Sequence, residues 1–194
     1  TFHGAFPHWL NGATGEEIPF SEKDDGGDLV ETALLVQGLI TARQYFNNAS
    51  ADETALRNTI NEIWRGVEWD WYRRDGENVL YWHWSPTYQW EMNHQIKGWN
   101  EALIVYALAA SSPSFPVPKI VYDHGGASNG AIQNNNTYYN VKLPLGPSLG
   151  GPLFFAHYSF LGINPKGLSD AYADYWEQNV AHTQINYNYA VANP

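Results

Sequence analysis

The chain has 194 residues, enough for one domain with a sizeable core, and a formal net charge of −10. This charge argues against nucleic acid and anionic membrane surfaces as main partners, because both repel acidic proteins. The absence of cysteine excludes disulfides and thiolate metal sites, and the longest apolar run, Ala102 to Ala110, is too short for membrane insertion.

Aromatic residues are unusually frequent, with nine Trp, thirteen Tyr and eight Phe. Many of them stand beside Asn, His, Gln or Asp instead of aliphatic residues. One interpretation is a large core that uses aromatic rings as filler. The other is a sugar-binding cleft, in which rings stack on pyranose faces while amides and carboxylates bind the hydroxyl groups.

The first two predicted helices form an antiparallel hairpin. A helix from Asp28 to Asn47 is apolar almost all the way round, which is typical of a buried helix. Ser50 and Glu53 have capping-box spacing and predict a second helix that ends near Trp64. The second helix has a single apolar stripe, so one of its faces meets solvent.

A β-hairpin is predicted next. Asp75-Gly76 separates two aromatic, alternating segments, residues 69–74 and 77–84. Asp-Gly between such segments is a strong hairpin signal.

A third helix is predicted over 88–110, with a break near Gly98. Residues 111–152 are rich in Pro, Gly, Asn and Tyr, and we expect an ordered loop that forms a cleft wall, because loops of this length are often functional. A short apolar stretch follows at 153–161, and the last helix is predicted over 169–189.

These elements predict a mainly α fold, an (α/α) barrel built from pairs of inner and outer helices. A barrel of six pairs needs twelve helices of roughly 11 residues with connections of about 5, which alone approaches the length of the chain. Residues 1–194 are therefore expected to form one domain that is roughly the N-terminal half of the barrel, incomplete at its C-terminus. A second chain or segment would complete it.

Four carboxylates lie within eight residues at the head of the first helix: Asp24, Asp25, Asp28 and Glu31. Capping explains part of this cluster, because an aspartate at N-cap and a glutamate at N3 suit a helix start. Gly26-Gly27 argues against one continuous helix, so we expect Asp24 and Asp25 on the entering loop. Capping does not explain these two acids, and buried carboxylates are costly unless they are paired or used in chemistry.

Glu101 is the second candidate, because it heads another apolar segment. Burial would raise the pKa of a lone carboxyl there and suit it to general acid catalysis, whereas the alternative is an acid favoured by the helix dipole. Glycoside hydrolysis needs two carboxyl groups that flank the scissile bond, and Glu101 could face the Asp24–Glu31 cluster in that way. Glu91 is a further cleft candidate.

No metal site is expected. His94 and His157 lack a recognised ligand spacing, and a lone histidine is usually a structural hydrogen-bonding residue. Asp123-His124 could belong to a catalytic triad, but the Gly-x-Ser-x-Gly motif of a nucleophile elbow is absent.

The sequence contains five further blocks in this order: residues 1–9, 24–31, 81–86, 98–101 and 151–159. Together these blocks resemble the glycoamylase-like domain family, whose members include endo-β-1,2-glucanases of glycoside hydrolase family 144. The resemblance covers nearly the whole chain.

The resemblance implies an (α/α)6 toroid that hydrolyses β-1,2-linked glucan with inversion of configuration. It places the implicated acids at Asp24, Asp28, Glu31 and Glu101. We expect Glu101 to be the general acid, Asp24 and Asp28 to activate water, and Glu31 to hold that network.

The resemblance also implies a β-glucan oligosaccharide substrate, no cofactor, and a periplasmic or secreted location in bacteria. The candidate substrate-binding residues are Trp82, His83, Trp84, Trp90, Glu91, His94, Trp99, His157 and Tyr158. Two alternatives stay open. One is a module that binds glucan without cleaving it, and the other is a transglycosylating domain of the cyclic β-1,2-glucan synthase type.

Overall fold

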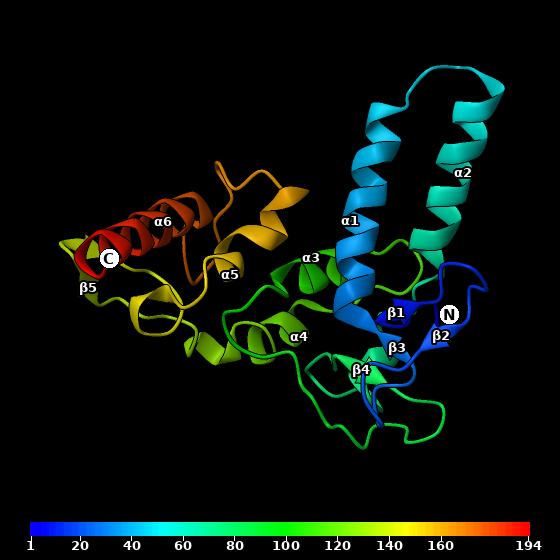
Figure 1. Ribbon diagram of the computed structural model, residues 1–194, viewed down its shortest axis with the longest axis horizontal. Helices are drawn as coiled ribbons and strands as arrows, with labels where there is room; N and C mark the ends of the chain where they lie inside the picture. Colours follow the sequence, from blue (N-terminus) through cyan, green and yellow to red (C-terminus); the bar gives the residue numbers. More distant parts are fainter.

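The computed structural model describes residues 1–194 and is mainly helical, with three small two-stranded antiparallel sheets (Figure 1). The helices are α1 (Leu29–Tyr45), α2 (Ala51–Gly66), α3 (Leu103–Ser111), α4 (Lys119–His124), α5 (Phe154–His157) and α6 (Tyr175–Ala192). The strands are β1 (Trp9–Leu10), β2 (Glu17–Ile18), β3 (Gly27–Asp28), β4 (His83–Trp84), β5 (Thr137–Tyr138) and β6 (Val141–Lys142). None of the helices has both the length and the apolar composition of a membrane span.

The predicted hairpin of α1 and α2 is confirmed, and the two helices run antiparallel in Figure 1. Ser50 caps α2, since its side chain accepts a hydrogen bond of 3.3 Å from the Glu53 amide. The Glu53 carboxylate does not return to Ser50, as a full capping box requires. It accepts instead from the amide of Asn48, at 2.7 Å.

The prediction that the first helix is buried holds only for its first half. Leu29 and Val36 are completely buried, although Leu35 in the same half is 41% exposed. No residue of α1 after Gln37 is buried, and Tyr45 at its end is 77% exposed. The reason lies in the neighbours of α1. Its first half packs in the main core, and its far half stands clear of the other helices except α2 (Figure 1).

Two hydrophobic clusters hold the chain together. The main cluster joins the first half of α1 to α3, α4 and the segment around residues 67–80. The second, smaller cluster packs the start of α6 against the segments around residues 127–145 and α5. In Figure 1 the α1–α2 hairpin and α6 lie at opposite ends of the molecule, with α3 and α4 between them.

The predicted β-hairpin at Asp75-Gly76 is wrong. Trp71–Arg73 forms a 3-10 turn, and the backbone of Asp75 and Gly76 follows it with φ of +61° and +87°. The Arg73 guanidinium ties this loop by donating to the carbonyls of Gly76 and Glu77. The second predicted strand is replaced by β4, which pairs with β3, far away in the sequence.

The third predicted helix is much shorter than expected, because only α3 forms over 88–110. The preceding segment turns at Asn93 and Gly98, whose φ values of +50° and +82° are incompatible with a right-handed helix. The last helix, α6, begins later than predicted, at the point where the Asp174 carboxylate accepts from the Glu177 amide. The long loop of residues 111–152 is ordered and contains α4, β5 and β6.

Candidate active site

The acid-bearing segment folds as its sequence predicts, with Asp24 and Asp25 on a loop and Asp28 as the N-cap of α1. Asp28 Oδ1 accepts hydrogen bonds of 2.9 Å from the amides of Val30 and Glu31. These bonds satisfy two of the amides that a helix start leaves without partners. Asp28 thus has a structural role, and its side chain is fixed in position.

Gly26 and Gly27 let this segment approach other segments of the chain more closely than residues with a side chain would allow. A Cβ atom on Gly26 would lie 2.1 Å from the carbonyl oxygen of Trp84, and one on Gly27 would lie 2.1 Å from the hydroxyl of Tyr72. The resulting β3–β4 pair aligns Asp28 with His83. The two glycines therefore place the carboxylates beside the aromatic segment of residues 81–84.

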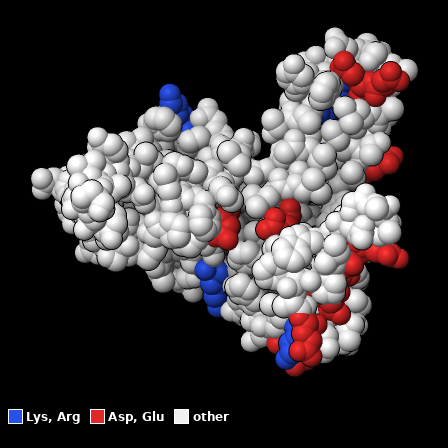
Figure 2. Space-filling view, in the orientation of Figure 1, with Lys and Arg blue, Asp and Glu red and all other residues white.

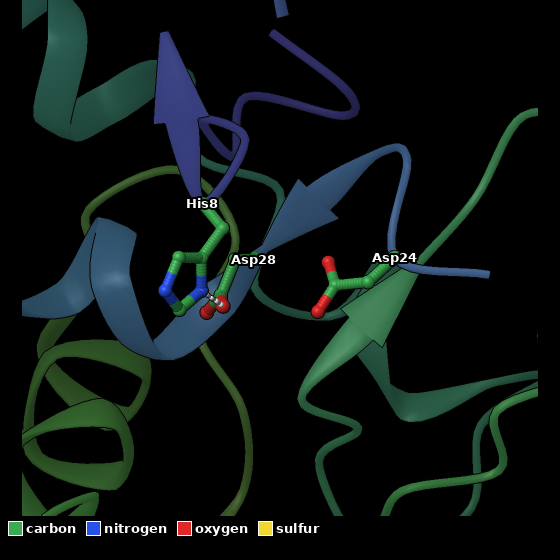
Figure 3. Close-up of side chains that lie close together, drawn as sticks. All are labelled: His8, Asp24 and Asp28. Carbon is green, nitrogen blue, oxygen red and sulfur yellow. Dashed lines mark hydrogen bonds and ion pairs between the residues drawn. The ribbon is translucent and has the colours of Figure 1, made fainter. Parts of the chain in front are cut away.

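His8, Asp24 and Asp28 form a compact cluster at the foot of α1 (Figure 3). His8 Nδ1 donates to Asp28 Oδ2 at 2.8 Å, and the carboxylate of Asp24 points toward that pair. Each residue offers a possible metal-ligand atom, and these atoms all lie within 4.8 Å of one another. The cluster could hold a divalent cation, although two of its atoms already bond to each other.

Asp24 is a buried carboxylate that is only partly satisfied, and Asp25 and Glu17 also each have one buried oxygen without a donor. Asp24 is 8% exposed, and its Oδ1 has no hydrogen-bond donor. His83 Nε2 lies 3.1 Å from Oδ1, but in a direction that does not make a hydrogen bond. Burial lowers the pKa of His83, which favours the neutral ring and weakens the ionic attraction between the two.

Two carboxyl groups in this region, those of Asp28 and Glu17, have a raised pKa. Burial raises the pKa of Asp28, and the hydrogen bonds from the Glu31 amide and His8 oppose this rise. Burial also raises the pKa of Glu17 on β2, and the nearby charges of Asp25 and Asp24 add to the effect. Figure 2 shows acidic atoms near the foot of α1 and few basic atoms on the same face.

Glu31 and Glu101 are both half-buried. Glu31 lies in the first turn of α1, whereas Glu101 precedes α3, which packs against α1. Glu101 is fixed through its backbone, because its carbonyl accepts a hydrogen bond of 2.8 Å from Ser159 Oγ. Its carboxyl group is less buried than the sequence suggested, and it precedes the helix instead of lying in the first turn.

The predicted cleft residues of the segment 82–94 fall into different environments. Trp82 stacks on His94 with ring centroids 4.9 Å apart, and His83 is buried. Trp84 and Trp90 are half-buried and pack on the edge of the main core. Glu91 is exposed and forms an ion pair with Lys23, which connects this segment to the acid-bearing loop.

The remaining candidates lie away from the carboxylate cluster. Trp99 is 8% exposed and stacks on Tyr175 in the second hydrophobic cluster. Tyr158 is 45% exposed, and His157 lines an open groove of about 800 Å³ along α6. No carboxylate lines this groove.

Two residues near the carboxylates were not among the predicted site residues. His8 contacts Asp28 from a position twenty residues earlier, and Glu17 reaches the acids from β2. Both contacts depend on the course of the N-terminal segment, which has no periodicity. The only signal in the sequence was the density of His and Trp in residues 1–9.

Comparison with known proteins decides the family. The Glycoamylase family model, described as "Putative glucoamylase", matches residues 93–194, which is more than half of the chain. The chain belongs to the glycoamylase family. The resemblance stated from the sequence is thereby confirmed.

Relatives of this glycoamylase-family chain include proteins named for β-1,2-glucans. An exo β-1,2-glucooligosaccharide sophorohydrolase (non-reducing end) of Parabacteroides distasonis is 43% identical over 99% of this chain and 29% of that protein. The endo-β-1,2-glucanase of Chitinophaga pinensis, in complex with sophorotriose and glucose, is 52% identical with a TM-score of 0.95. A putative glucoamylase from Bacteroides uniformis is also 52% identical, with a TM-score of 0.96.

Both of these solved structures match 100% of this chain, which covers 47% of each of them. The chain thus spans less than half the length of the relatives that it matches. The identity and the TM-scores show that this chain shares its fold with the matching part of those structures.

Proposed function

We propose that this chain is part of a glycoside hydrolase that cleaves β-1,2-linked glucan with inversion, and that its helices belong to an (α/α)6 toroid. The relatives named as β-1,2-glucan hydrolases support the substrate. The observation that best supports this chemistry is the environment of Asp24. Asp24 is a buried carboxylate with an oxygen that no donor satisfies, beside a second carboxylate that is held in place by His8 and by α1.

The proposed roles follow from the surroundings of each acid. Glu101 protonates the leaving oxygen, because it is a half-buried carboxyl group at the head of α3, the helix that packs against α1 and its acids. Asp24 and Asp28 activate the attacking water, with Asp24 as the acceptor whose oxygen is available. Glu31, one turn along α1, holds the water network. An inverting enzyme needs about 6.5–9.5 Å between its acid and its base to admit that water.

Linear β-1,2-glucan provides the test, with reducing ends followed over time and the anomer of the first product identified by NMR. We expect the α-anomer from the β-linkage, and we expect Glu101→Gln to abolish turnover while binding is retained. Glu62→Gln, which changes an exposed acid on α2, is the matched control and should not alter the rate. Binding without any product in the wild-type protein would replace this proposal with a glucan-binding role.

We also propose that the protein is exported to the periplasm or beyond the cell, as the family resemblance implies. Cell fractionation of the native host, followed by detection of the protein, tests the location. Recovery only in the cytoplasmic fraction would contradict it.

A further inference from the structure

An exposed aromatic platform borders the carboxylate cluster. It consists of His8, Trp9 and Phe20, which we call the hairpin platform. The ring centroids of Trp9 and Phe20 are 5.0 Å apart, and the His8 ring lies 4.3 Å from Phe20 and 5.5 Å from Trp9. Trp9 is 49% exposed and Phe20 is 51% exposed, so the two large rings are in mutual contact and still present half of their surface to solvent.

The platform is attached to both acids of the cluster. His8 donates through Nδ1 to Asp28, which leaves Nε2 for another partner. The Phe20 amide donates to the carbonyl of Asp24 at 2.9 Å, and Trp9 is held by its pairing with Ile18 in the β1–β2 sheet. One side-chain hydrogen bond and two sets of backbone contacts therefore hold the platform beside the carboxylates.

Exposure alone does not identify a ligand, since single exposed apolar residues are normal. The neighbours of the platform distinguish the possibilities. Asp28 and Asp24, beside the rings, are already buried, at 1% and 8% exposed, and Asp24 Oδ1 has no hydrogen-bond donor. The apolar, charge-depleted centre of a protein–protein interface supplies few donors to such an acceptor. A sugar supplies both contacts, because it offers a C–H face to the rings and hydroxyl groups to the acceptor beside them.

We propose that the hairpin platform is a glucosyl-binding subsite next to the reacting carboxylates. The identity of the sugar, a unit of β-1,2-linked glucan, rests on the proposed function. The rings of Trp9 and Phe20 stack on the pyranose, and His8 Nε2 contacts one of its hydroxyl groups. The subsite fixes one end of the oligosaccharide, so it contributes to binding more than to bond cleavage.

Calorimetry with sophorotriose tests the subsite, in the Glu101→Gln background that keeps the ligand intact. We expect Trp9→Ala and Phe20→Ala each to weaken binding roughly 2- to 10-fold, the range of one aromatic stacking contact. In the protein that keeps Glu101, Trp9→Ala and Phe20→Ala should each raise KM by a similar factor and leave kcat nearly unchanged. Leu10→Ala is the matched control, because Leu10 is 47% exposed on the same strand and should bind and react as the parent does.

The outcomes separate this subsite from the proposed function. If Trp9→Ala and Phe20→Ala keep the parental affinity and KM, the subsite is overturned even though hydrolysis stands. If the wild-type protein binds sophorotriose but releases no reducing ends from linear β-1,2-glucan, and Trp9→Ala weakens that binding, the subsite stands and hydrolysis is overturned. Absence of binding in the wild-type protein overturns both. A dimer in sedimentation that Trp9→Ala dissociates, with sugar affinity unchanged, would assign the platform to a protein contact.

Discussion

Asp28 has two roles, and two substitutions separate them. Asparagine caps a helix as well as aspartate does, so Asp28→Asn should keep the bonds from Val30 and Glu31 and change the free energy of unfolding by less than about 1 kcal/mol. Asp28→Ala loses the cap, which costs about 1 kcal/mol, and leaves buried donors without an acceptor, which costs a further 1–3 kcal/mol or so. The total of about 2–4 kcal/mol corresponds to a fall in Tm of roughly 5–15 °C.

Thermal unfolding followed by circular dichroism measures the first role, and reducing-end release from β-1,2-glucan measures the second. We expect Asp28→Asn to melt close to the wild-type temperature and yet lose at least about 100-fold in turnover, the usual contribution of a group that transfers a proton. Asp28→Ala should lose both stability and turnover. Equal losses of stability in the two variants would refute the cap argument, and normal turnover of the asparagine variant would remove Asp28 from the chemistry.

The remaining predictions concern packing and pH. Gly26→Ala should lower the Tm strongly, because its Cβ would collide with the Trp84 carbonyl. Gly38→Ala, in an open position of α1, should instead stabilise the fold by up to about 1 kcal/mol. Equal effects of the two substitutions on the Tm would contradict the close approach of β3 and β4. Burial lowers the pKa of His182 in the folded chain. At a pH below 6.5, its value in the unfolded chain, the unfolded chain therefore binds more protons than the folded chain. The free energy of unfolding should therefore fall as pH falls from 7.5 to 5, by up to about 1.4 kcal/mol per pH unit from this residue. His182→Gln should flatten the dependence of Tm on pH. Parallel curves of Tm against pH for the wild-type and variant proteins would refute this.

Local patterns in the sequence predicted what local interactions determine. The caps of α1 and α2 follow from Asp28 and Ser50, whose partners lie two or three residues away. The hairpin at Asp75-Gly76 failed because His83–Trp84 pairs with β3, a partner that no local pattern reveals.

The candidate site shows the same difference between contacts that are local in the sequence and contacts between distant segments. The sequence already groups Asp24 with Asp28, because they are four positions apart. It did not place His8 on Asp28 or His83 beside Asp24, because both contacts are made between segments that are distant in the sequence. The pattern of residues 88–110 predicted a helix with a break near Gly98, and Gly98 does have a positive φ. The pattern did not reveal that the residues before Gly98 form turns instead of helix, with a positive φ at Asn93.

The first turn of a helix is usually where its amide hydrogens exchange fastest with solvent, and α1 reverses this order. The Asp28 amide donates to the Phe6 carbonyl and the Leu29 amide to the Trp82 carbonyl, while Asp28 holds the next two. The opposite end of α1 is exposed around Tyr45. Thermal opening of α1 must therefore begin at its far end, which lets the α1–α2 hairpin fray and re-form while the carboxylates stay in register.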